Sequence, residues 1–191
     1  MAPGYAAPLR HAAQNLAAKL GLDTHSVRLA QDGIDAWRLC FRICQAAEAW
    51  AAHGRWVTET SPQFGEDISR RFAMAAGLDA ADIKLMQNRR KDIAKRMQDL
   101  VADDAAILVP GAGGPPPPRG LTGAKLDQVR DAALSILCPA GHACLPQIAM
   151  PALQTKAGPI GLGLIGPRSS DAALISLVAE METITPATSI Y

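Results

Sequence analysis

The sequence has few aromatic residues, almost no net charge and no long apolar segment. Aromatic residues make up 4% and charged residues 19% of the 191 positions, and the formal net charge is +1. Such a balance gives no electrostatic reason to expect nucleic acid or an anionic membrane surface as a partner. No apolar run approaches the roughly 20 residues that span a bilayer, and the first residues lack a signal-peptide pattern. We therefore predict a cytoplasmic protein with no nucleic-acid or membrane partner.

Cysteine is also scarce, with four residues in the whole chain. This number is too small for a secreted scaffold held together by disulfides, so reduced thiols are expected. A chain of this length buries roughly 70% of the surface that its unfolded form exposes, which is enough for one domain. We predict a single domain over residues 1–191.

The first half of the chain is predicted to be mostly helical. Apolar residues at helical spacing predict helices over residues 9–20 and 34–53, the second ended by Gly54. Residues 25–30 alternate apolar and polar side chains, which predicts a short strand. Ser61-Pro62 could begin a further helix, and residues 83–101 form a longer one.

One face of the helix predicted over residues 83–101 is strongly basic. Asp92 lies four residues before Arg96, a spacing that favours an ion pair within the helix. We interpret the basic run from Arg89 to Arg96 as a solvated face and not as a nucleic-acid site.

The second half begins with a short buried strand and ends with a hairpin and a helix. Residues 105–109 predict the strand, and a glycine- and proline-rich loop follows at 111–118. A helix is expected over residues 121–137. Two apolar runs at 147–153 and 159–165, separated by a turn, then predict a hairpin, with Ser169-Ser170-Asp171 beginning the last helix.

The order of motifs in this last part resembles the C-terminal end of amidase-signature enzymes, which hydrolyse carboxylic amides. The resemblance rests on a Pro-Ala-Gly loop after Cys138, then Leu-Pro-Gln-Ile from Leu145, Gly-Pro-Ile-Gly-Leu-Gly-Leu-Ile-Gly-Pro-Arg from Gly158, and Ser-Asp before the last helix. Weaker matches extend it back to about Ala17. It implies an α/β fold in which helices flank a partial mixed β-sheet, as in the C-terminal portion of the amidase-signature fold.

The resemblance also implies what the chain lacks. Family enzymes use a serine nucleophile, a second serine held by a cis peptide and a lysine base, placed in a Gly/Ser-rich region that has no counterpart here. The only Ser-Ser pair, Ser169-Ser170, is interpreted as a helix cap, and no lysine has a matching context. By resemblance, Ala140, Gly141 and His142 line the acyl side of a substrate pocket, and no cofactor or metal is implied.

Two other patterns suggest chemistry but fit it poorly. Cys138, His142 and Cys144 offer three zinc ligands, or a thiol nucleophile beside an imidazole. A structural zinc site needs a fourth ligand, however, and small buried cysteines explain the pattern equally well. The glycines of Gly161-x-Gly163-x-x-Gly166 lie within a predicted strand, which argues against a dinucleotide site.

Three hypotheses follow for function. The first is an amidase-family protein that supplies scaffold and pocket wall but no catalytic residue, and acts on a small-molecule amide only when a catalytic half completes it. The second is a non-catalytic subunit that docks on a separate amidase chain, as a homo- or hetero-oligomer. The third is a truncated gene product, which the DNA upstream of Met1 would reveal.

Overall fold

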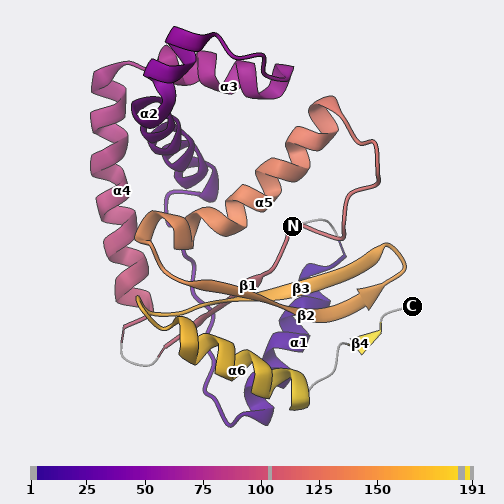
Figure 1. Ribbon diagram of the computed structural model, residues 1–191. Helices are drawn as coiled ribbons and strands as arrows, with labels where there is room; N and C mark the ends of the chain where they lie inside the picture. The colour runs from indigo at the N-terminus through magenta and orange to yellow at the C-terminus, as the bar shows by residue number, and fades with distance from the viewer. Residues whose placement is uncertain (1–3, 103–104, 185–187, 190–191) are drawn as a thin grey trace.

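The computed structural model describes residues 4–102, 105–184 and 188–189, and arranges helices on both sides of a small sheet (Figure 1). Helices α2 to α5 lie on one side of the sheet, and α1 and α6 lie on the other. The elements are α1 (Ala6–Lys19), α2 (Ile34–Thr60), α3 (Glu66–Ala76), α4 (Ala80–Leu100), β1 (Ile107–Pro110), α5 (Gly123–Ala143), β2 (Gln147–Thr155), β3 (Gly158–Ile165), α6 (Asp171–Ile184) and β4 (Thr188–Ser189). The predicted partial mixed sheet flanked by helices is therefore confirmed.

The sheet has the strand order β1-β3-β2-β4. The predicted hairpin is present: β2 and β3 pair antiparallel, with an irregularity between Pro151 and Leu153. Strand β1 pairs antiparallel with the other edge of β3, and β4 pairs parallel with β2, which makes the sheet mixed. The central position of β3 explains its apolar sequence, because five of its residues are buried.

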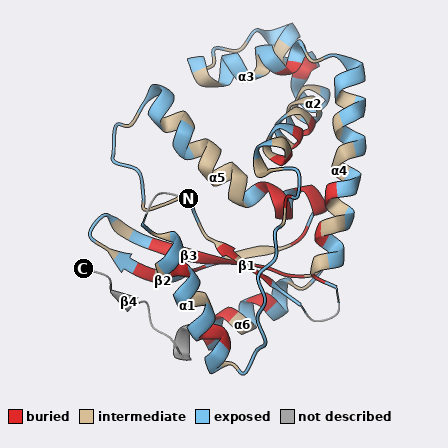
Figure 2. Cartoon of the chain, turned by 180° about the vertical axis from the view of Figure 1, so that it is seen from behind, coloured by how far each residue is buried: buried red, intermediate tan, exposed pale blue. Residues whose placement is uncertain are grey.

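Two apolar clusters cover the two faces of the sheet (Figure 2). The upper cluster joins α2, α4 and α5 to β1 and includes Trp37, Cys40, Met97 and Ile165. The lower cluster joins α1 and α6 to the hairpin, and its members include Leu16 and Ile160. Side chains alternate between the two faces along β3, as the period of a strand requires.

The strand predicted at residues 25–30 is wrong, because this segment joins α1 to α2 as irregular backbone. Its carbonyl groups are occupied by a distant side chain. The guanidinium group of Arg96 donates to the carbonyl oxygen of Leu29 at 2.5 Å and to that of Arg28 at 2.6 Å. Arg96 therefore binds this segment and not Asp92, so the predicted ion pair within α4 is replaced by a tertiary contact.

The predicted end of α2 at Gly54 is also wrong, because the helix continues to Thr60. Gly54 is required by a neighbouring indole and not by a turn: a Cβ atom at this position would lie 2.7 Å from Trp50. The helix ends at Ser61, which has a left-handed conformation with φ 44°. Helix α3 accordingly begins at Glu66 and not at the Ser61-Pro62 dipeptide.

Helix α5 extends further than predicted and absorbs the expected Pro-Ala-Gly loop. Pro139 lies inside the helix, which ends at Ala143 with Cys144 in a left-handed conformation at φ 51°. This turn lets the backbone N–H of Leu145 donate to the carbonyl of Ala140 at 3.1 Å. A proline inside a helix costs about 3 kcal/mol, but Cys138, Pro139 and Ala140 are buried, so packing offsets the loss.

In the part of the chain that the structure describes, none of the helices combines the length and the apolar character that crossing a bilayer requires.

Candidate functional site

The three residues predicted to line a pocket lie in the last turns of α5. Ala140 and His142 are buried, with 3% and 4% of their surface exposed, whereas Gly141 is exposed. A Cβ atom on Gly141 would lie 2.7 Å from the ring of Phe41, so glycine permits α2 and α5 to pack closely here. Of the three, only Gly141 faces solvent.

His142 is enclosed by aromatic rings at the junction of α5 and α2. Its ring meets the edges of Phe41 and Trp37, with centroids 5.3 and 6.3 Å away. Nε2 lies 3.0 Å from the carbonyl oxygen of Trp37. A carbonyl only accepts hydrogen bonds, so Nε2 carries the proton and Nδ1 is a bare acceptor. No partner for Nδ1 is found among the described residues.

This environment opposes a positive charge on His142. Burial lowers the pKa of the imidazole, and the nearby guanidinium of Arg90 lowers it further, although the bond to Trp37 acts in the other direction. A neutral imidazole held by one bond at Nε2 serves as a packing element in this arrangement. It cannot exchange a proton with a substrate without opening the α2–α5 contact.

We predict that the protein loses stability as the pH falls below about 6.5, because His142 binds a proton more readily unfolded than folded. The loss begins near the unfolded pKa and levels off once the pH is below the folded pKa. Within that window the free energy of unfolding falls by about 1.4 kcal/mol per pH unit. Urea unfolding at a series of pH values measures it.

The matched control for this prediction is His142→Gln, which cannot be protonated. Its unfolding free energy should be flatter between pH 6.5 and the acid limit, even if it is lower throughout. The other three histidines are exposed and remain in the variant. Equal pH dependence in wild type and variant would contradict the assignment to His142.

The cysteine pattern does not form a reactive centre in the structure. Burial raises the pKa of the Cys138 thiol to about 12, and that of Cys40 to about 12 as well. Cys144 is exposed and is separated from the bond that His142 makes with Trp37. Among the described residues, no group of three or more His, Cys, Asp or Glu side chains is placed to hold a metal ion. All four cysteines are free thiols.

The basic face of α4 is tied to neighbouring elements. Arg89 pairs with Asp32 before α2, and Arg90 pairs with Glu48 on α2. Lys95 pairs with Asp99 along the helix at 2.8 Å. These charges are thus partly neutralised within the fold. Gly161 and Gly163 lie within β3, as predicted, and not in a turn that opens a helix.

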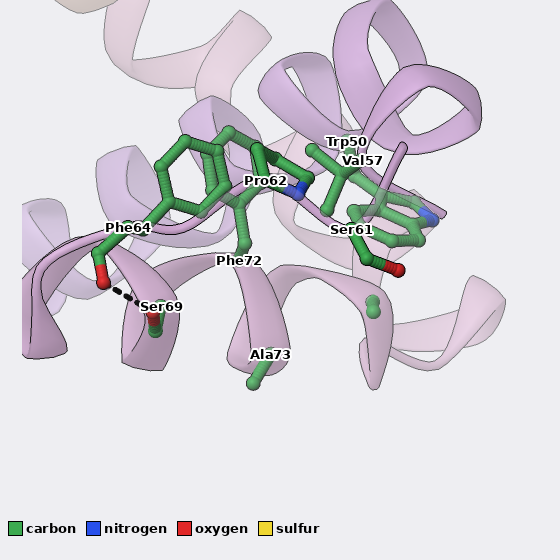
Figure 3. Close-up of a pocket in the computed structure, with 9 residues that line it drawn as sticks. Trp50, Val57, Ser61, Pro62, Phe64, Ser69, Phe72 and Ala73 are labelled. Atoms are coloured by element: carbon green, nitrogen blue, oxygen red, sulfur yellow. Dashed lines mark hydrogen bonds between the residues drawn. The ribbon is translucent and has the colours of Figure 1, made fainter. Parts of the chain in front are cut away.

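An aromatic hollow, which the sequence did not predict, lies between α2 and α3 (Figure 3). Phe64 stacks on Phe72 with centroids 5.1 Å apart and ring planes at 17°, and Trp56 meets the edge region of Phe64 at 5.9 Å. The hollow has a volume of about 290 Å³. Its lining consists of Trp50, Val57, Ser61, Pro62, Phe64, Ser69, Phe72, Ala73 and Ala76. The signal in the sequence was the grouping of aromatic residues between 50 and 72.

Comparison with known proteins gives consistent matches. Amidase 1 of Arabidopsis thaliana is 28% identical over 137 residues, covering 72% of this chain and 32% of that protein. A glutamyl-tRNA(Gln) amidotransferase polypeptide of Streptococcus equi subsp. zooepidemicus is 31% identical over 157 residues, covering 79% of this chain and 31% of the relative. No protein-family model matches the chain.

The fold has the same counterparts. The crystal structure of a bacterial aryl acylamidase of the amidase-signature family superposes with a TM-score of 0.73 at 17% identity, covering 94% of this chain and 40% of that one. The chain spans about a third of the length of the curated relatives, and the match falls in their C-terminal part.

Proposed function

Because this chain is related in sequence and fold to the C-terminal part of amidase-signature enzymes, we propose that it forms the scaffold and acyl-side pocket wall of an amide-hydrolysing fold. In this proposal it supplies no nucleophile, and a small-molecule amide is processed only when a catalytic part is present. Serine attack needs a nucleophile, a proton acceptor and an oxyanion hole assembled together.

The state of the serine hydroxyl groups is the observation that carries this proposal. Each hydroxyl that donates a hydrogen bond gives its proton to a backbone carbonyl oxygen, and none of these oxygens can act as a base. In the Ser169-Ser170 pair, for instance, Ser170 donates to Pro167 at 2.8 Å. The same holds for Ser69, Ser135 and Ser176. These hydroxyls stabilise turns and helices.

The thiols offer no alternative nucleophile of the kind that amide attack requires. The thiolate is the reactive form of cysteine, and burial holds the pKa of both Cys40 and Cys138 near 12. At neutral pH these side chains are protonated and act as small apolar groups in the upper cluster.

The pocket-wall part of the proposal rests on the last turns of α5. Gly141 is the exposed member of the three residues that the family resemblance assigns to the acyl side. Ala140 and His142 are buried behind it and hold the turn in place against α2. In this proposal Gly141 presents backbone to a substrate, while the other two position it.

A turnover assay tests the proposal. We expect the purified chain to release no amine or ammonia from a panel of aliphatic and aryl amides above the buffer blank. Turnover that co-purifies with the folded chain through two independent columns would show that it carries its own catalytic residues, and the proposal would be wrong.

A second candidate function is that of a non-catalytic subunit that docks on a separate amidase-like chain. The outer edge of β1 favours it, since no described strand pairs with β1 on the side away from β3. The backbone N–H of Gly111 donates to Gly161 at 2.8 Å, and these residues are opposite when the register of β1 and β3 is continued by one position. Antiparallel pairs alternate, so Leu108 directs its N–H and C=O outward. An open edge of this kind can accept a further strand.

A further inference from the structure

Half of the aromatic side chains of this protein gather outside both apolar clusters. The chain has three tryptophans, three phenylalanines and two tyrosines. Of these eight, Trp50, Trp56, Phe64 and Phe72 surround the hollow between α2 and α3, and none belongs to the core clusters. In a chain so poor in aromatic residues, this concentration at one surface needs a reason beyond core packing.

The hollow has the composition of the centre of a protein interface. Its lining is apolar apart from two serine hydroxyls, and it contains no charged side chain. Ion pairs lie close to it in the chain on both helices, Arg55 with Glu59 on α2 and Arg70 with Asp67 on α3. Interfaces combine an apolar centre rich in Trp, Tyr and Phe with a polar surround.

The hollow and a projecting indole lie side by side on the same surface. Trp56 is 49% exposed, although its ring contacts Phe64, which lines the hollow. A cavity of about 150 Å³ holds a benzene ring, so a hollow of about 290 Å³ has room for a two-ring indole. A projection next to a matching recess is what a two-fold contact between identical chains requires, because the same patch serves both copies.

We propose that this surface is a self-association site, in which Trp56 of each chain inserts into the aromatic hollow of a second copy. Both helices carry acidic and basic residues near the hollow, so a copy turned by 180° meets no surface of uniform charge. The contact is independent of the open edge of β1 and of any amide chemistry. One indole per chain buries much less than the roughly 800 Å² per partner of a standard interface. The dimer is therefore weak, with a Kd of about 10–100 µM.

Sedimentation equilibrium from about 5 to 500 µM protein tests this proposal, a range chosen to bracket the expected Kd. Wild type should pass from monomer to dimer across it. Trp56→Ala, which removes the projection, should raise the Kd at least tenfold. Ala73→Gln, which fills the recess from an exposed helical position, should do the same without truncating an aromatic side chain. Leu85→Ala, on α4 at another exposed apolar residue, is the matched control and should dimerise like wild type.

Three results would overturn the proposal. These are a wild-type chain that stays monomeric at the highest concentration, a Kd that is unchanged in both hollow variants, and an equal loss of dimer in Leu85→Ala. Circular dichroism of each variant confirms that it is folded, and the two independent hollow variants keep the test decisive if one of them unfolds.

Discussion

Gly161→Ala is expected to lower the free energy of unfolding by about 2–3 kcal/mol, the upper part of the range for overpacked sites. A Cβ atom at this position would lie 2.8 Å from the carbonyl oxygen of Met150. That oxygen belongs to the backbone of β2, which pairs with β3 along its whole length, so it cannot move aside without breaking the hairpin. Gly161 also lies directly beside Gly111, whose own Cβ would meet it at 3.0 Å.

The matched control is Gly77→Ala at the end of α3, where the nearest atoms would lie at an ordinary 3.6 Å and φ is −92°. Its change should stay within about 0.5 kcal/mol. Urea denaturation at pH 7.5 measures both variants. Similar midpoints for Gly161→Ala and Gly77→Ala would mean that β2 and β3 do not pack as described.

The backbone amide of Leu108 is expected to exchange with solvent about 10³-fold faster than that of Gly111, a ratio typical of exposed and core amides. Leu108 directs its N–H away from β3, whereas the N–H of Gly111 is bound to Gly161 at 2.8 Å. Both residues lie at the same edge of one short segment, so they share solvent conditions. Hydrogen exchange followed by nuclear magnetic resonance resolves the two amides.

Equal protection of Leu108 and Gly111 would contradict an open edge and remove the basis of the docking-subunit candidate. The candidate also makes a positive demand. When an amidase-like catalytic chain is added, protection should appear at Leu108 and leave Gly111 unchanged, because only the outward amide gains a partner.

The C-terminal hairpin and helix could be predicted from sequence because the signals are local. Apolar runs around a Gly-containing turn specify β2 and β3, and Ser170-Asp171 precedes α6. The ends of other elements were missed where a tertiary contact decides them. Pro139 is a helix breaker by itself, but burial of its neighbours against α2 keeps it inside α5. Arg96 is 67 residues from Leu29, so its effect on residues 25–30 has no local signal.

The candidate sites divide in the same way. The sequence indicated Ala140, Gly141 and His142 by family resemblance, but it could not say that two of them are buried and that Gly141 is exposed. The aromatic hollow requires α3 to fold back on α2 after the left-handed Ser61, which is a tertiary event. Gly54 was misinterpreted as a helix end because a glycine tolerated for its lack of a Cβ looks the same in sequence as one that ends a helix.

The absence of a nucleophile is tested most directly by a fluorophosphonate probe, which reacts covalently with activated serines. Intact-mass measurement after incubation should show the unmodified mass of the folded chain, with a catalytically competent amidase-signature enzyme labelled alongside as the positive control. A mass increase of one probe adduct, mapped by peptide sequencing to a single serine and abolished by its substitution with alanine, would contradict the proposal.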